Sequence, residues 1–220
     1  MIRPNQTVLF QGDSITDAGR GREILLPNDR SALSLGYVGL IASEVLSRRP
    51  LDGLQFYNRG ISGNRITDLL ARWPKEAIPL RPHWISILIG INDCWHLFRS
   101  KTGTDLLRFE QIYRILLELT RETLPETGLI LGEPFALACG GFHEEWLIDL
   151  AKRREIVRKH AADFGAILVP FQGLFDELAE EAPAEFWLPD GVHPSIAASA
   201  RMARFWLERV PCLPPGTAGV

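Results

Sequence analysis

The chain has 220 residues, of which 46% are hydrophobic, and its formal net charge is −3. This is the composition of an ordinary globular domain, and a chain of this length can bury a full hydrophobic core. The 24 basic residues are interspersed with acidic ones and form no long basic run, so no nucleic-acid partner is expected.

The sequence predicts neither a membrane span nor an export signal. No apolar run approaches the roughly 20 residues that a spanning helix needs. The first ten residues, MIRPNQTVLF, lack a basic leader followed by an apolar core. The three cysteines, Cys94, Cys139 and Cys212, are widely spaced and show no metal-ligand pattern, which suits a reducing compartment. We therefore expect a cytoplasmic protein with no membrane partner.

The first predicted strand ends abruptly at a serine. The β-favouring run TVLF at 7–10 is followed by QGDS at 11–14, and residues 15–18 can begin a helix. A serine at such a junction is held away from its sheet, near unpaired backbone N–H groups that can bind an anion. A nucleophilic serine needs this geometry, although a Gly-Asp-Ser tripeptide alone is more typical of a turn and helix N-cap.

Four further strands alternate with helices along the rest of the chain. The expected strands are 54–58, 83–91, 128–133 and 166–170, and the expected helices are 34–49, 67–71, 105–124, 144–164, 174–180 and 194–209. The strand at 83–91, HWISILIGI, is apolar almost throughout, as in the centre of a parallel sheet covered on both faces. The alternation predicts an α/β fold with a five-stranded parallel sheet and helices on both sides.

Three segments fall outside this alternation. Residues 19–36 show no clear periodicity and predict a long loop that can shape a substrate pocket. Pro74 and Pro79 are expected to interrupt the helix that begins at 67 or 68. We expect one domain at 1–210, followed by a loose tail at 211–220 that is rich in proline and glycine.

Residues suited to catalysis follow the predicted strands. Ser14 follows the first strand, Gly63 the second, Asn92 the third, and Asp190 and His193 come after the fifth. Ligands bind at the carboxyl edge of such sheets, so these residues should lie together. A histidine can take the serine proton, and a carboxylate on its other nitrogen fixes the tautomer. The backbone N–H groups of Ser14 and Gly63 and the Asn92 amide could hold an oxyanion.

These segments resemble the successive sequence blocks of the SGNH hydrolases, also called the GDSL esterase/lipase family. In the family's order, the blocks are GDSITD at 12–17, the loop at 60–63, GIND at 90–93 and DGVHP at 190–194. The resemblance implies a three-layer α/β/α sandwich like that of flavodoxin. It also implies a nucleophile at Ser14, an acid–base pair at Asp190 and His193, and oxyanion donors at Ser14, Gly63 and Asn92.

Finer features are similar to the bacterial intracellular acetylxylan esterases of this superfamily. They are NRGISGN at 58–64, ARW at 71–73, GINDCW at 90–95 and VHPS at 192–195. Those enzymes remove acetyl groups from xylo-oligosaccharides and are homo-oligomers. The resemblance therefore implies a homo-oligomeric serine esterase that hydrolyses short-chain acetyl esters of oligosaccharides or other small molecules.

Two other functions stay open on the sequence. One is the same chemistry on longer acyl chains, as in a lipase, thioesterase or lysophospholipase, although no apolar lid helix is predicted. The other is a carbohydrate-binding homologue without turnover, although every catalytic position is filled.

Three further residues are candidates for substrate binding. Trp95 and His96 could wall the pocket, and ordinary packing explains them equally well. Asp13 lies beside the serine, although a hydrogen bond to the turn backbone is the more common use of such a residue. We expect neither metal nor cofactor, because no HExxH, CxxC, P-loop or GxGxxG motif occurs.

Overall fold

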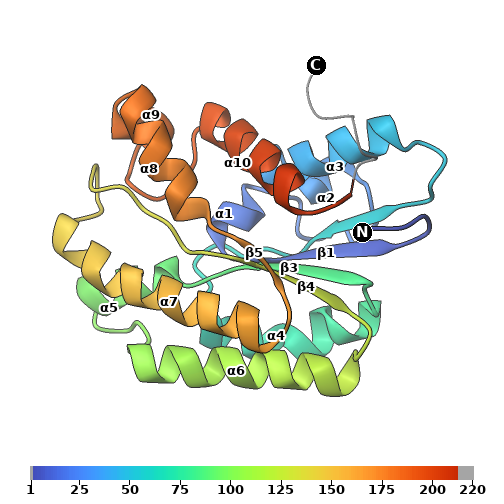
Figure 1. Ribbon diagram of the computed structural model, residues 1–220, viewed down its shortest axis with the longest axis horizontal. Coiled ribbons are helices and arrows are strands. Elements are labelled where there is room, and N and C mark those ends of the chain that lie inside the picture. Colours follow the sequence, from blue (N-terminus) through green and yellow to red (C-terminus); the bar gives the residue numbers. More distant parts are fainter. Residues whose placement is uncertain (1, 213–220) are drawn as a thin grey trace.

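Residues 2–212, which the computed structural model describes, place a parallel sheet between two layers of helices (Figure 1). Its strands are β1 (Thr7–Gly12), β2 (Gln55–Asn58), β3 (Trp84–Leu88), β4 (Gly128–Gly132) and β5 (Ile167–Val169). They lie in the order β2-β1-β3-β4-β5, and each neighbouring pair is parallel. The predicted three-layer α/β/α sandwich with five parallel strands is confirmed.

Helices connect the strands and cover both faces of the sheet. They are α1 (Ser14–Asp17), α2 (Arg30–Leu33), α3 (Tyr37–Arg48), α4 (Ile66–Glu76), α5 (Ile91–Arg99), α6 (Leu106–Thr123), α7 (Leu147–Asp163), α8 (Phe171–Glu181), α9 (Ala184–Trp187) and α10 (Ile196–Arg209), with the short 3-10 helices η1 (Ile78–Leu80) and η2 (Glu144–Trp146). Figure 1 shows α3, α8 and α10 on one face and α4, α6 and α7 on the other. None of the described helices is both long and apolar enough to cross a bilayer.

The strand order reverses beside β1, and this reversal places the site. The chain passes from β1 outward to β2 and then returns to β3 on the other side of β1. The segments that leave β1 and β3 therefore diverge at the carboxyl ends of these strands, which leaves room for a ligand between them.

Successive side chains of β1 belong to the two hydrophobic clusters on opposite faces of the sheet. Val8 and Phe10 belong to the apolar cluster under α3 and α10, whereas Leu9 belongs to the cluster under α4 and α6. All three side chains are fully buried. Since successive side chains of a strand point to opposite faces, a sheet covered on both sides needs this continuous apolar run.

The predicted end of the helix near Ala71 is wrong. Helix α4 continues through Pro74 to Glu76, and it begins at Ile66, where the Asp68 carboxylate accepts a hydrogen bond from the backbone N–H of Arg65 (2.9 Å). Pro74 is exposed, whereas its neighbour Trp73 is fully buried and donates from Nε1 to Thr120 Oγ1 (3.0 Å). Packing of the last turn thus outweighs the cost of a proline inside the helix, about 3 kcal/mol.

The two ends of the described chain meet. The N–H of Ile2 donates to the carbonyl of Pro211 (3.0 Å), and Arg49 Nη1 donates to the carbonyls of Ile2 (3.0 Å) and Cys212 (2.7 Å). The remainder of the predicted loose tail, 213–220, lies outside the described residues. The domain boundary at 210 and the loose tail both stay predictions.

Candidate active site

Ser14 lies where β1 turns directly into α1. The turn needs glycine at position 12, because a Cβ there would come within 2.4 Å of both the Leu88 carbonyl oxygen and Thr16 Oγ1. The next residue, Asp13, caps α1 by accepting a hydrogen bond from the N–H of Ile15 (3.0 Å). The tight turn holds the Ser14 hydroxyl at the carboxyl edge of the sheet, at the start of α1.

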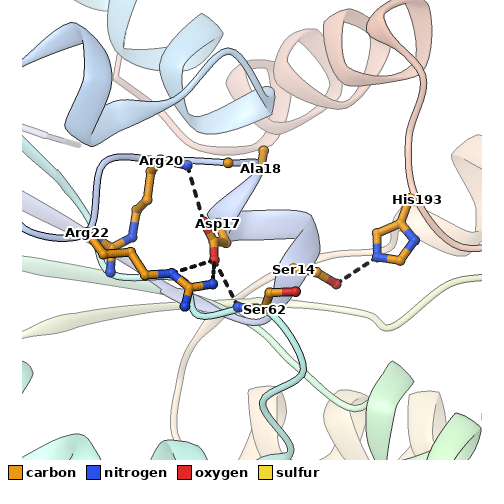
Figure 2. A pocket seen from close by; sticks show the side chains of 8 residues that line it. Ser14, Asp17, Ala18, Arg20, Arg22, Ser62 and His193 are labelled. Carbon is orange, nitrogen blue, oxygen red and sulfur yellow. Dashed lines mark hydrogen bonds and ion pairs between the residues drawn. The ribbon is translucent and has the colours of Figure 1, made fainter.

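Ser14, His193 and Asp190 are joined by two hydrogen bonds. Ser14 Oγ lies 2.8 Å from His193 Nε2 (Figure 2), although 179 positions separate the two residues in the sequence. His193 Nδ1 lies 2.6 Å from Asp190 Oδ2. If Nδ1–H donates to the carboxylate, Nε2 is left to accept the serine proton. The structure therefore brings these three predicted residues together in the order that proton transfer requires.

Backbone N–H groups of the two residues Val192 and His193 fix the position of the Asp190 carboxylate. Its Oδ1 accepts hydrogen bonds from the N–H groups of Val192 (3.0 Å) and His193 (2.7 Å). Burial by itself would raise the pKa of Asp190, but the hydrogen bonds from His193 and Val192 outweigh it and lower the pKa below its ordinary value. The carboxylate is thus ionised and able to stabilise a protonated imidazole.

Gly63 and Asn92 lie on the two segments that follow β2 and β3. Gly63 has a φ of +82°, a conformation that favours glycine. Asn92, the second residue of α5, donates from Nδ2 to the carbonyl of Asn64 (3.1 Å), which ties the two segments together. The second N–H of this amide is left for another acceptor. Their role as oxyanion donors stays a prediction.

An open pocket of about 520 Å³ lies in front of the Ser14–His193 pair (Figure 2). Its lining residues are Ser14, Asp17, Ala18, Gly19, Arg20, Arg22, Ser62 and His193. Gly19, Arg20 and Arg22 come from the segment 19–36, for which the sequence predicts a pocket-shaping loop. Within this segment the structure also contains α2, capped by Asp29, which the sequence analysis missed.

Asp17 connects three parts of the pocket wall. Its carboxylate accepts hydrogen bonds from the N–H of Ser62 (2.9 Å), the N–H of Arg20 (3.2 Å) and the guanidinium of Arg22. Sequence reasoning missed Arg20 and Arg22, and the signal available was two arginines directly after the serine block. Helix α1, the glycine-containing loop after β2 and the arginine-bearing loop are thereby held as one unit.

Asp13 does not line the pocket, because its carboxyl group is fully buried. Burial is the largest influence on this group and raises its pKa to about 7, although the hydrogen bond from Ile15 and the charge of His193 lower it. We therefore propose that Asp13 caps α1 and does not bind substrate.

Trp95 and His96 lie on α5, a helix that is not among those predicted from the sequence. Trp95 packs edge-on against Phe142, with ring centroids 5.9 Å apart, and near Trp146 at 6.4 Å. Neither Trp95 nor His96 lines the pocket. The contacts of Trp95 support ordinary packing, and a substrate contact for either residue stays a prediction. Among the described residues, no group of three or more His, Cys, Asp or Glu side chains is arranged to hold a metal ion.

Comparison with known proteins gives the relationship of this chain to others. Residues 10–201 match the model of the GDSL-like Lipase/Acylhydrolase family. An acetylxylan esterase of Geobacillus stearothermophilus is 32% identical over 216 residues, which cover 95% of both chains. A multidomain esterase of Ruminococcus flavefaciens is 28% identical over 59% of this chain and 16% of its own length.

Solved structures agree with these sequence matches. A protein from Parabacteroides merdae described as a GDSL-like lipase superposes with a TM-score of 0.93 at 37% identity, covering 97% of this chain and 99% of its own. The acetylxylan esterase Axe2 of Geobacillus stearothermophilus superposes with a TM-score of 0.87 at 30% identity, with the same coverage of both chains. Three further Axe2 structures are described as catalytic mutants. One has a serine replaced by alanine, one an aspartate and one a histidine.

Proposed function

The chain belongs to the GDSL-like Lipase/Acylhydrolase family and is a carboxylic ester hydrolase, and from this premise we propose that it is a serine esterase for short acyl groups. We propose O-acetyl groups of xylo-oligosaccharides or related carbohydrates as its substrates. The observation that carries the proposal is the pair of hydrogen bonds from Ser14 Oγ to His193 and from His193 to Asp190. The acetylxylan esterase relative supports the substrate class, and its catalytic mutants affect the same three residue types.

In the first half-reaction, His193 Nε2 takes the Ser14 hydroxyl proton while Oγ bonds to the acyl carbonyl carbon. The carbonyl π electrons move onto oxygen, and this oxyanion accepts hydrogen bonds from the N–H groups of Ser14 and Gly63 and from the Asn92 amide. The ionised Asp190 carboxylate stabilises the imidazolium. The bond to the leaving oxygen then breaks, and the alcohol departs with the proton of His193.

In the second half-reaction, water replaces the alcohol. His193 takes a proton from water as the water oxygen attacks the acetyl-Ser14 carbonyl. The bond between Ser14 Oγ and the acyl carbon breaks, Oγ regains the proton from His193, and acetic acid leaves and gives its proton to solvent, which yields acetate. Each half-reaction returns His193 to its neutral form.

The character of the pocket wall favours a short acyl group over a lipid. Asp17, Arg20, Arg22 and Ser62 line the space beside Ser14. A long alkyl chain laid along this wall would remove water from charged and polar groups without replacing their hydrogen bonds. We therefore propose an acetyl esterase and not a lipase, a thioesterase or a lysophospholipase.

Two measurements test the substrate assignment. Acetate release from acetylated xylo-oligosaccharides is expected, and rates on a series of p-nitrophenyl esters should fall as the acyl chain lengthens. A preference for octanoyl or longer chains would overturn the short-chain assignment. Cleavage of p-nitrophenyl acetate without acetate release from the sugar would leave the chemistry in place and remove the carbohydrate assignment.

The oligomeric state and the cellular location are two further proposals. We propose a homo-oligomer from the family resemblance, and a monomer mass by light scattering at every concentration would contradict it. A cytoplasmic location remains a proposal supported by the three cysteines, which are free and buried.

A further inference from the structure

The described lining of the pocket contains two arginines and one carboxylate. Arg20, Arg22 and Asp17 all line the pocket, and Asp17 is the one carboxylate among its described lining residues. The Arg22 guanidinium pairs with Asp17, whereas Arg20 Nε donates to a neutral acceptor, the carbonyl of Gly60 (2.8 Å). With His193 neutral, the lining therefore carries one more positive than negative charge.

Arg20 lines the pocket, but most of its side chain is buried. Arg20 is 7% exposed, and its Nη1 has no hydrogen-bond partner among the described residues. Burial and the nearby Arg59, another buried arginine, lower the pKa of Arg20. Glu76, a further carboxylate in this region, already pairs with Arg72 (2.5 Å). An anion in the pocket would relieve this excess of positive charge.

Arg22 is the arginine that a ligand can reach. Its side chain is 49% exposed. In Figure 2 it lies against Asp17, with Ser62 between this pair and the Ser14–His193 pair. Asp17 receives hydrogen bonds from Nε and Nη2 of Arg22, and Nη1 has no bonded partner among the described residues. A guanidinium has five donors and binds a carboxylate through two of them at once.

We propose that the pocket takes an ester that carries a carboxylate, with Arg22 contacting this carboxylate and Arg20 supplying positive charge behind it. The inference rests on the proposed function, which places the ester group at Ser14. The cavity of about 520 Å³ is of the size that holds small-molecule ligands, typically ~300–1,000 Å³, so a sugar ring can extend from Ser14 toward Arg22. Within the carbohydrate class, the substrate is an O-acetylated sugar that bears a uronic acid.

Two matched substrates test the inference. They are the mono-O-acetylated methyl glycosides of glucuronic acid and of glucose, which differ only in a carboxylate and a hydroxymethyl group. Wild-type enzyme is expected to have a kcat/KM about tenfold higher for the acid, mainly through a lower KM, because the acid gains a charged hydrogen bond to the half-exposed Arg22; this ratio corresponds to about 1.4 kcal/mol. This ratio should shrink as salt is added, because the pocket is open to solvent.

Arg22→Gln should bring the ratio of kcat/KM for the acid and the neutral sugar close to one. Arg108→Gln is the matched control, because Arg108 is also an exposed arginine paired with an aspartate, Asp105, and lies on α6. It removes the same charge from the protein at a position outside the pocket lining, and the preference for the acid should persist. If Arg108→Gln lost the preference for the acid as fully as Arg22→Gln, the preference would come from the overall charge of the protein, and the inference would be overturned.

The remaining outcomes separate this inference from the proposed function. Hydrolysis of both sugars with a wild-type ratio near one, or a ratio that survives in Arg22→Gln, overturns the inference and leaves the esterase in place. If the enzyme prefers p-nitrophenyl hemisuccinate to p-nitrophenyl acetate, and Arg22→Gln abolishes that preference, the anion-binding site stands and the bound carboxylate belongs to the acyl group. If wild-type enzyme hydrolyses none of these esters, the proposed function and the inference fall together.

Discussion

Asp13, the residue before the proposed nucleophile, carries a fully buried carboxyl group. Burial raises its pKa to about 7, against the ordinary value of 3.8. Between these pH values the folded protein keeps a proton that the unfolded chain has lost. The stabilisation from neutral Asp13 is therefore complete below about pH 4 and is lost as the pH rises toward about 7.

We expect Asp13→Asn to flatten this dependence. Asparagine keeps an oxygen that can accept from Ile15 N–H and removes the titrating group. From about pH 5 to about pH 7, the free energy of unfolding should fall more steeply in wild type than in the variant, by up to about 1.4 kcal/mol per pH unit. Urea unfolding of wild type and variant at both pH values measures these changes in the free energy of unfolding.

Asp29→Asn is the control for that measurement. Asp29 caps α2 through the N–H groups of Ser31 and Ala32 and is partly exposed, so this variant makes the same chemical change at a helix cap outside the buried interior. If wild type and Asp13→Asn lost stability in parallel with rising pH, the assigned protonation of Asp13 would be wrong.

At the scale of elements, the segment 137–142 holds the turn that carries Asp190. The N–H of Leu137 donates to the carbonyl of Gly191 (3.0 Å), and the N–H of Gly141 donates to that of Asp190 (3.1 Å). Between them, Gly140 has a φ of +55°, and a Cβ on it would lie 2.6 Å from the Cα of Asp190. The close approach of the two segments therefore requires glycine here.

Gly140→Ala should displace Asp190 and impair catalysis. We expect kcat on p-nitrophenyl acetate to fall about tenfold or more with a small change in KM, because misplaced catalytic groups cost up to ~10²-fold. Gly165→Ala is the control, since Gly165 has a similar φ of +61° and nothing within 4 Å of the added Cβ. Both variants carry the same kind of backbone strain. Equal kcat values for the two variants would refute the conclusion that segment 137–142 positions Asp190.

The sheet could be predicted from the sequence because its strands are continuous apolar runs between turn residues. Helix α5 could not be predicted. The apolar run HWISILIGI continues past the end of the strand and includes Ile91, the first residue of α5, and the turn between strand and helix depends on the φ of +125° at Gly90. The motif order predicted that Ser14, His193 and Asp190 would lie together. It could not predict the directions of Arg20 and Arg22, because the side chains of an irregular loop follow no period.

At the scale of the whole molecule, Arg49 joins the two ends of the described chain. Its guanidinium donates to the carbonyls of Ile2 and Cys212 and to Asp52, and its side chain is only 9% exposed. Removing it leaves two carbonyl groups without their charged donor. A single side chain thus couples β1, through the residues before it, to the end of α10.

Arg49→Ala should lower the free energy of unfolding by about 1.5–3 kcal/mol, the range for hydrogen bonds to charged groups. Arg201→Ala is the control, since Arg201 donates twice to the exposed Glu181 and such surface pairs contribute little to stability. Urea unfolding monitored by circular dichroism measures both variants. If Arg49→Ala lowered the free energy of unfolding no more than Arg201→Ala does, the stabilising role of Arg49 between the two ends of the described chain would be contradicted.

The central claim is that Ser14 is the nucleophile of an ester hydrolase. The most direct test is the hydrolysis of p-nitrophenyl acetate by wild type and by Ser14→Ala, with Ser47→Ala, an exposed serine on α3, as the control. We expect activity from wild type and Ser47→Ala and a kcat lower by about 10³-fold or more for Ser14→Ala. A Ser14→Ala enzyme that keeps wild-type activity would contradict the account.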